Sequence, residues 1–212
     1  MPDGLLIDIG CGNGLVSLYV AMQRPNIDVL TIDIDYKICV KAISNVNRYG
    51  MKNRITVLNG DFFALNPPDA IAFCSNPPLI PGEVGFLYTK NGRETPFWIA
   101  LLEYARILPI KPIVYLHLFD FHGLENARTG SWPTLEEIAI SNKYNIHWMY
   151  RGIRNIGAMS KIRKHFQEIA KTFPRGPVII NGTLLSFSEA ISNNYDLQSA
   201  DIKIYQTIVS LH

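Results

Sequence analysis

The sequence of 212 residues has few cysteines and no long hydrophobic run. Its three cysteines form no C-x-x-C pair, and no histidine cluster follows them. An odd number of widely spaced cysteines indicates neither a disulfide framework nor a zinc site. We therefore expect Cys11, Cys39 and Cys74 to be reduced thiols that are partly buried.

The longest apolar stretches, LLIDIG and PIVYLHLF, are much shorter than the ~20 residues that a membrane-spanning helix needs. The N-terminus also lacks the basic and apolar regions of a secretory signal peptide. These absences predict a cytoplasmic protein that does not enter a membrane.

Charge of one sign is concentrated in a single segment. The net charge of the chain is +2, but residues 151–175 carry seven lysines and arginines against one glutamate. Such a segment can bind phosphate groups or an acidic partner, or it can be an ordinary solvated helix face. The sequence leaves both interpretations open.

Short apolar segments alternate with helical patterns over the first 119 residues, which predicts a parallel sheet built from βαβ units. We expect strands at 5–9, 28–33, 55–59, 70–75 and 112–119, and helices at 15–24, 36–50 and 95–108. After residue 120 the pattern predicts a helix at 133–144, a strand at 146–153, a basic amphipathic helix at 159–173, a hairpin at 178–187 and a strand at 202–211.

Three glycines, Gly10, Gly12 and Gly14, lie between the first predicted strand and the first predicted helix. Glycine allows a tight turn and leaves room for a ligand, and the helix N-terminus offers unpaired N–H groups. The pattern indicates a cofactor that contains a nucleoside, but its spacing differs from the G-x-G-x-x-G of nicotinamide enzymes. Asp33 ends the second predicted strand, where its carboxylate can accept two hydrogen bonds from a ribose diol or simply face solvent.

Four segments carry a resemblance to a known family: DIGCGNG (8–14), TID (31–33), NGDFF (59–63) and SNPPL (75–79). They resemble the motifs of class I S-adenosylmethionine-dependent methyltransferases. Within these they are most similar to the branch with an NPPY-type motif, which includes release-factor glutamine methyltransferases and adenine- and guanine-amino methyltransferases. The resemblance implies a Rossmann-like α/β fold, with helices on both faces of a mostly parallel, seven-stranded sheet and an elaborated C-terminal part.

The resemblance also implies site residues, and the implied cofactor is S-adenosylmethionine. The implied cofactor-binding residues are Asp8, Gly10, Gly12 and Gly14 at the methionine part, Asp33 at the ribose, and Ile34, Asp61 and Phe62 at the adenine. The residues that would hold the methyl acceptor are Asn76, Pro77, Pro78 and Leu79. No metal is implied, and His117, Asp120 and His122 are too few to indicate a metal site.

The N-P-P motif suits a planar nitrogen, whose delocalised lone pair makes it a poor nucleophile. The Asn76 side chain and the Pro77 carbonyl can accept both N–H bonds and aim the lone pair at a methyl donor. The prolines hold these acceptors rigidly. A plain turn after a strand is the alternative for SNPPL taken alone.

The chain departs from the family in three respects. Such folds usually close with an antiparallel hairpin, but about 50 residues separate the candidate closing strands 146–153 and 202–211. Leu79 stands where the family usually has an aromatic residue that can stack on a flat acceptor. Only four residues precede the first predicted strand, where family members usually carry a recognition domain. We expect recognition to come from the C-terminal part or from a partner subunit, unless the chain is a fragment.

These patterns predict one methyltransferase domain over residues 1–212. Residues 1–119 would bind the cofactor and carry the N-P-P motif, and residues 120–212 would complete the sheet around a basic helical insertion. The leading acceptor is a protein glutamine, and the alternative is a base of RNA, or less readily of DNA, bound through the basic segment. A non-catalytic, methyltransferase-like binding subunit is the third hypothesis. Tyr88, Lys90 and Arg93 follow the motif closely enough to touch the acceptor, but we expect them on a solvated, mobile loop.

Overall fold

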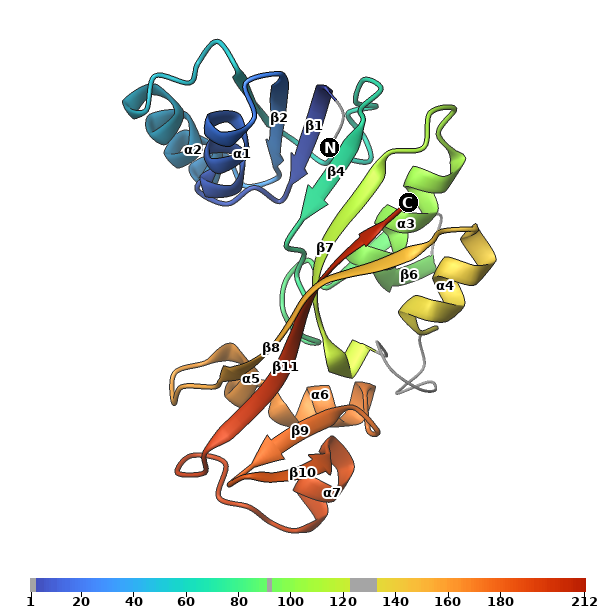
Figure 1. Cartoon of the computed structure of the whole chain (residues 1–212). Helices are drawn as coiled ribbons and strands as arrows, with labels where there is room; N and C mark the ends of the chain where they lie inside the picture. The colour runs from blue at the N-terminus through green and yellow to red at the C-terminus, as the bar shows by residue number, and fades with distance from the viewer. Residues whose placement is uncertain (1–2, 91–92, 123–132) are drawn as a thin grey trace. The chain divides into compact units, whose positions relative to one another are not determined.

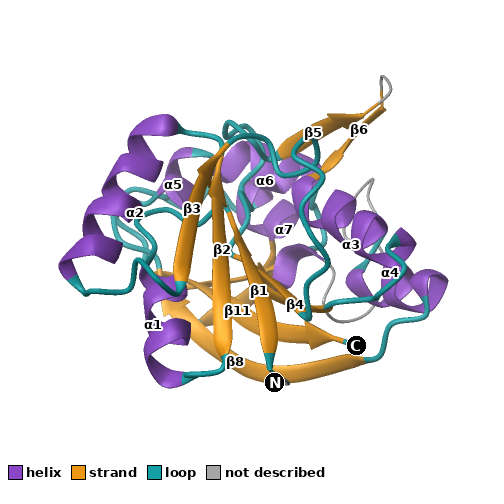
Figure 2. Cartoon of the chain, turned by 90° about the horizontal axis from the view of Figure 1, so that it is seen from above, coloured by secondary structure: helices purple, strands orange, loops and turns teal. Residues whose placement is uncertain are grey.

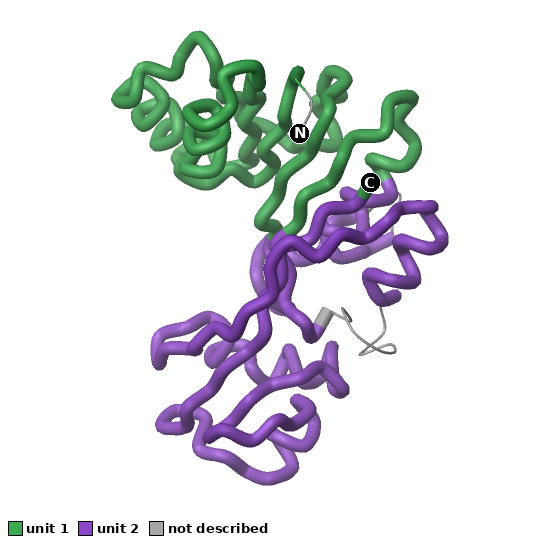
Figure 3. The backbone as a smooth tube through the Cα atoms, in the orientation of Figure 1, with its two compact units in different colours: residues 1–77, 104–116, 212 green, residues 78–103, 117–211 purple. Residues whose placement is uncertain are grey.

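The computed structural model describes residues 3–90, 93–122 and 133–212 of the chain (Figure 1). Helices and strands alternate along most of it (Figure 2). The chain divides into two compact units, which are residues 1–77, 104–116 and 212, and residues 78–103 and 117–211 (Figure 3). The expected single domain, with its halves at 1–119 and 120–212, stays a prediction.

The first unit is a parallel sheet with helices between its strands. Its elements are β1 (Gly4–Ile9), α1 (Leu15–Gln23), β2 (Ile27–Asp33), α2 (Tyr36–Arg48), β3 (Ile55–Asn59), β4 (Ala72–Ser75) and the start of β7 (Ile113–Phe119). The strand order is β7-β4-β1-β2-β3, and every neighbouring pair is parallel. The strands and helices predicted for residues 5–59 are therefore confirmed, with ends shifted by at most two residues.

The core of the first unit joins α1 and α2 to four strands. It contains Leu6, Leu18, Ala21, Ile27, Val29, Val46, Ile55 and Ala72. Successive strand residues face opposite sides of a sheet, so Ile7 and Phe73 face away from this cluster, yet both are fully buried. A parallel sheet that is covered on both faces needs such continuous apolar strands, which is why the sequence pattern located them well.

The second unit contains long antiparallel strands. Its elements are β5 (Leu87–Lys90), β6 (Arg93–Pro96), α3 (Phe97–Ile107, up to Glu103), the end of β7, a 3-10 turn (Asp120–His122), α4 (Leu135–Asn142), β8 (Ile146–Asn155), α5 (Lys161–Lys164), α6 (Phe166–Thr172), β9 (Pro177–Ile180), β10 (Thr183–Ser186), α7 (Phe187–Ser192) and β11 (Ile202–Leu211). The strand order is β10-β9-β11-β7, and β8 pairs antiparallel with β11. None of the described helices is long and apolar enough to cross a membrane.

The C-terminal strands pair as expected for the closing pair of the sheet, but the sheet is larger than predicted. β9 lies beside β11 and β10 lies beside β9, so this hairpin adds two strands to the seven. Its turn is at Asn181 and Gly182, both with positive φ, as the sequence predicted.

The predicted basic helix at 159–173 is wrong as one continuous helix. It breaks at His165, whose φ of −104° and ψ of 17° lie outside the helical range. The break separates α5, which buries Ile162, from α6, which buries Phe166 and Ile169.

Two further elements were not predicted. Strands β5 and β6, which carry Tyr88 and Arg93, pair antiparallel where a loop was expected. Their polar residues give no alternating apolar signal, and the dipeptide Asn91-Gly92 between them is the sequence feature that could have indicated the pairing. Helix α7 begins at a capping box in which the Ser186 hydroxyl accepts from the Glu189 N–H and the Glu189 carboxylate accepts from the Ser186 N–H. This S-x-x-E pattern was readable in the sequence.

Arg163 ties together three parts of the second unit. Its guanidinium donates to the carbonyls of Ile156 and Gly157 after β8, and to those of Leu197 and Ala200 before β11. Hydrogen bonds from a charged guanidinium are stronger than those from a neutral donor, and here one side chain makes them to four carbonyls. The side chain is therefore structural and is not available to a ligand.

We predict that Arg163→Ala lowers the free energy of unfolding of the second unit by about 3 kcal/mol, because the four carbonyls lose their donor. Urea unfolding followed by tryptophan fluorescence measures this, since all three tryptophans fall in the residue ranges of the second unit. The matched control is Lys164→Ala, which removes an exposed neighbouring cation. Equal stability of both variants would contradict the assignment.

Candidate functional site

The candidate site lies in the first unit, at the carboxyl ends of β4, β1, β2 and β3, which are neighbours in that order (Figure 2). The chain moves from β1 to β2 and β3 on one side, and β4 returns to the other side of β1. Ligands of open α/β sheets bind outside the carboxyl ends of strands at such a reversal. The glycine turn follows β1 and the N-P-P motif follows β4, so the two motifs meet at this point.

The glycine loop is held against the end of β2. Gly10, Gly12 and Gly14 all have positive φ, at 71°, 57° and 79°. The N–H groups of Gly10 and Cys11 donate to the Ile32 carbonyl at 2.9 and 3.2 Å. A Cβ added at Gly10 or Gly12 would meet nothing within 4 Å, so the loop presents open backbone. A ligand can therefore lie directly against it.

Asp33 is fixed by backbone donors from both sides. Its Oδ2 accepts from the Gly12 N–H at 3.1 Å and its Oδ1 accepts from the Asp35 N–H at 3.0 Å. A carboxylate has about four acceptor positions, so two hydrogen bonds orient it without exhausting it. The half-buried Asp33 carboxylate can still accept from a diol.

The turn after Asp33 is supported from β3. The Asn59 side-chain amide donates to the carbonyls of Asp33 and Ile34, at 3.0 Å each. The Ile34 side chain is left 75% exposed. Because the Asn59 hydrogen bonds hold the turn in place, the exposed Ile34 side chain can offer an apolar contact to a flat ligand.

Asp8 is buried beneath the glycine loop, where it is hydrogen-bonded to Ser17, which in turn is hydrogen-bonded to Thr31. The Ser17 hydroxyl donates to Asp8 Oδ2 at 2.5 Å, and Thr31 Oγ1 lies 2.7 Å from the same Ser17 oxygen. Because Ser17 has one proton, Thr31 is the donor of the second bond when Asp8 is ionised. Burial raises the pKa of Asp8 to about 6, although the Ser17 hydrogen bond opposes this shift.

The segment after β3 has one polar residue at the surface and one aromatic residue in the core. Asp61 Oδ1 accepts from the Phe63 N–H at 3.0 Å. The Phe62 ring is 3% exposed and makes edge contacts with Phe63, Phe73 and Tyr104. Only a small part of the Phe62 ring is available to a ligand, and its adenine contact stays a prediction.

The N-P-P motif begins beside the glycine loop. Ser75 is paired in register with Ile9, and the buried Ser75 hydroxyl donates to the Ile9 carbonyl at 2.8 Å. Asn76, which follows, is exposed. Asn76 and Pro77 are the last residues of this part of the first unit, and Pro78 and Leu79 belong to the second, where Leu79 is 4% exposed.

Ser17, Thr31, Asn45 and Asn59 support the site and were missed by the sequence prediction. Thr31 interrupts an apolar strand and Ser17 occupies a buried helix position, which is the signal that could have found them. The Asn45 amide donates to the Asn13 carbonyl in the glycine loop at 2.9 Å, a contact over 32 residues that no local pattern reveals.

The three cysteines are free, as expected. Burial raises the pKa of the Cys11 and Cys74 thiols to about 12 each, and raises the pKa of Cys39 as well. A thiol is reactive as the thiolate, so these groups stay unreactive near neutral pH.

His117 and Asp120 have partners within the second unit. His117 Nε2 lies 3.4 Å from Gln206 Oε1, and burial lowers its pKa. The buried Asp120 carboxylate accepts from the Arg151 guanidinium at 2.5 Å and from the Thr207 hydroxyl at 3.0 Å. The His122 side chain lies outside the described part of the chain.

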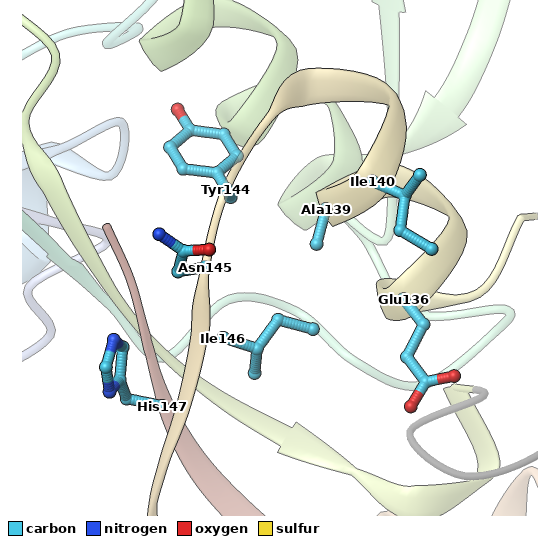
Figure 4. A pocket seen from close by; sticks show the side chains of 7 residues that line it. All are labelled: Glu136, Ala139, Ile140, Tyr144, Asn145, Ile146 and His147. Atoms are coloured by element: carbon cyan, nitrogen blue, oxygen red, sulfur yellow. The ribbon is translucent and has the colours of Figure 1, made fainter.

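A separate hollow of about 550 Å³ lies in the second unit, between α4 and the start of β8 (Figure 4). It is lined by Glu136, Ala139, Ile140, Tyr144, Asn145, Ile146 and His147. None of these is a predicted site residue. Ile146 and His147, which are neighbours on the strand, point to opposite sides of it in this view.

Comparison with known proteins gives partial sequence matches. Residues 3–67 match a family model described as "Putative methyltransferase". A release factor glutamine methyltransferase of Gloeobacter violaceus is 34% identical over 77 residues, which are 36% of this chain and 27% of that enzyme. A tRNA1(Val) (adenine(37)-N6)-methyltransferase of Bacteroides thetaiotaomicron is 37% identical over 75 residues, 34% of this chain and 32% of that enzyme. The matches thus span less than a third of each relative's length.

The fold extends the likeness over the whole chain. A precorrin-6y C5,15-methyltransferase of Geobacter metallireducens superposes with a TM-score of 0.51 at 11% identity, covering 100% of this chain and 82% of that one. The chain has the Rossmann-like α/β fold of class I methyltransferases, as predicted.

We predict that Asp8→Asn stabilises the chain at pH 7 by about 3 kcal/mol, because a pKa that differs by one between the folded and unfolded states corresponds to about 1.4 kcal/mol. The folded-state pKa of Asp8 is raised from 3.8 to about 6. The wild-type free energy of unfolding should therefore fall as pH rises from about 4 to about 6 and then level off. The Asn side-chain oxygen can still accept from the Ser17 hydroxyl. Because Asn does not ionise, the free energy of unfolding of the variant should not fall over this pH range.

Urea unfolding followed by circular dichroism between pH 4 and 8 measures the effect of Asp8→Asn. Asp69→Asn, at an exposed position, is the matched control. A variant less stable than wild type at pH 7 would show that the Asp8 charge is favourable in the fold.

Proposed function

We propose that this chain binds S-adenosylmethionine and transfers its methyl group to a planar nitrogen, with a protein glutamine side chain as the best acceptor. One observation carries the proposal. The open glycine loop, the anchored Asp33 and the exposed Asn76 follow β1, β2 and β4, which are adjacent at the reversal of strand order. We assign the glycine loop to the cofactor and the start of the N-P-P motif to the acceptor, because both follow strands that end at one edge of the sheet.

The residues present fit this cofactor. The backbone from Gly10 to Gly14 would hold the methionine part, since a Cβ at Gly10 or Gly12 would fill the open space beside the loop. The Asp33 carboxylate would accept from the ribose hydroxyls, and the exposed Ile34 would cover one face of the adenine. Asp61 and Phe62 are assigned to the adenine edge. Asp8, which is buried beneath the glycine loop, would stabilise the positively charged methionine part of the cofactor through its own negative charge.

When bound, S-adenosylmethionine supplies an electrophilic methyl group on a positively charged sulfur. The Asn76 side-chain oxygen and the Pro77 carbonyl would accept the two N–H bonds of the acceptor and hold its lone pair in line with that methyl group. Held by these two oxygens, the acceptor nitrogen would take the methyl group from the sulfur and would release one proton to water. Pro78 and Leu79 would support the acceptor. No side chain needs to act as a strong base.

The basic segment bears on the choice of acceptor. Arg151, Lys161 and Arg163 are engaged with Asp120, Glu83 and backbone carbonyls. Three of the seven cations at 151–175 are thus committed within the second unit, which weakens the case for a phosphate-binding surface. This favours glutamine over an RNA base.

An RNA base is the second candidate. Its support is the adenine methyltransferase relative together with Lys164, Lys171 and Arg175, which are exposed and have no described carboxylate within ion-pair distance. The two acceptors demand the same Asn76 chemistry. They differ in salt dependence, because only the nucleic acid releases counterions.

We predict that Asn76→Ala lowers methyl transfer at least 100-fold while the affinity for S-adenosylmethionine stays within about threefold, because the side chain orients the acceptor and not the cofactor. The assay follows tritium from labelled cofactor into peptides with a central glutamine, into matched asparagine peptides and into total tRNA. Asn145→Ala, exposed in the second unit, is the matched control.

Unchanged transfer in the Asn76→Ala variant would refute the role of Asn76. Cofactor binding by the wild type with no transfer to any of these acceptors would instead favour the non-catalytic binding subunit. Such a subunit could still depend on a partner for recognition.

A further inference from the structure

The segment that follows the N-P-P motif packs against α5 and α6 within the second unit. The chain from Leu79 to Phe86, here called the acceptor loop, is buried at both of its ends. Leu79, Ile80 and Phe86 are 4%, 8% and 4% exposed. Such burial at the ends of a short loop means that its path is fixed by packing and not by its own sequence alone.

An ion pair joins the middle of the acceptor loop to α5. Lys161 Nζ lies 2.7 Å from Glu83 Oε1. The lysine side chain is 72% exposed, but the glutamate side chain is only 16% exposed. The carboxylate is therefore largely buried, while the lysine that pairs with it remains mostly in solvent.

The backbone of the loop also approaches the break between the helices. Gly82 has φ +85°, and a Cβ there would lie 3.1 Å from His165 Nδ1. Gly85 has the same φ, and a Cβ there would lie 3.1 Å from Cγ of Pro78 in the N-P-P motif. The loop folds back on the motif at one glycine and meets His165 at the other.

Turn hydrogen bonds and an aromatic contact complete the arrangement. The Glu83 N–H donates to the Ile80 carbonyl at 3.1 Å, and the Phe86 N–H donates to the Glu83 carbonyl at 3.2 Å. The Phe86 ring meets the Phe173 ring, just after α6, edge-on with centroids 6.5 Å apart. The α5–α6 segment thus touches the acceptor loop at Glu83, Gly82 and Phe86.

We propose that the α5–α6 segment is the support that holds the acceptor loop in its working conformation, and that Lys161 is a positioning residue that acts through Glu83. This inference rests on the proposed function, since it assigns the loop to the methyl acceptor. The proposal gives the basic segment of residues 151–175 a role other than binding phosphate. The break at His165 is part of the support, because it meets the loop backbone at Gly82.

The ion pair can be tested without unfolding the chain. A pair with one largely exposed partner contributes little to global stability. Loss of the ion pair should therefore make the acceptor loop less ordered without unfolding the chain. The amides of Glu83 and Phe86, which make the turn hydrogen bonds, report that order by hydrogen exchange without any acceptor or cofactor.

The experiment compares Lys161→Glu, Glu83→Lys and the double reversal in the whole chain. Each single variant should speed exchange of the loop amides about fivefold and lower kcat/KM for the glutamine peptide about fivefold, since an exposed pair is worth up to about 1 kcal/mol. The dissociation constant for S-adenosylmethionine should not change. The double reversal and Lys161→Arg should restore both values. Lys164→Glu is the matched control and should change neither.

Loop exchange that is unchanged in both single variants would overturn the supporting role of α5. Faster exchange with unchanged kcat/KM would overturn the positioning of the acceptor by Lys161. Absence of transfer by the wild type would overturn the proposed function and its acceptor loop, and the exchange data would still report whether α5 orders residues 80–86.

Discussion

The hydrogen bond from the Gly12 N–H to the Asp33 carboxylate is the contact on which the candidate site depends. It joins the loop after β1 to the end of β2, so that the glycine turn and the Asp33 carboxylate are held side by side and can contact one ligand. Parallel pairing makes this possible, because it brings the carboxyl ends of β4, β1, β2 and β3 to one edge. The Ser75 hydrogen bond to Ile9 adds the start of the N-P-P motif to the same edge.

Much of the first unit was predictable because its strands are buried on both faces and its turns are marked by glycine. The positions of Gly10, Asp33 and Asn76 at strand ends follow from that pattern alone. The burial of Asp8 with Ser17, and the Asn45 contact to the glycine loop, were not predictable, because they join residues that are distant in sequence. The Phe62 ring is in the core because Phe73 and Tyr104 surround it, and tertiary contacts of this kind leave no local signal.

The second unit was harder to predict because its pairings are long-range and its charges are used internally. β8 pairs with β11 across an insertion of two helices, a hairpin and α7. The charge count of residues 151–175 suggested a surface for phosphate, yet Arg163 holds carbonyls and Lys161 holds Glu83. Composition records how many cations a segment has, but only the fold shows which of them already have partners.

Calorimetric titration of the whole chain with S-adenosylmethionine, compared between wild type and Asp33→Asn, tests the cofactor surface most directly. Wild type should bind the cofactor, and Asp33→Asn should bind it at least tenfold more weakly, because one charged hydrogen bond to the ribose is worth about 1.5–3 kcal/mol. Asp28→Asn, exposed near the other end of β2, should bind as wild type does. No binding by the wild type at millimolar cofactor, or equal binding by Asp33→Asn, would contradict the assignment of this edge to the cofactor.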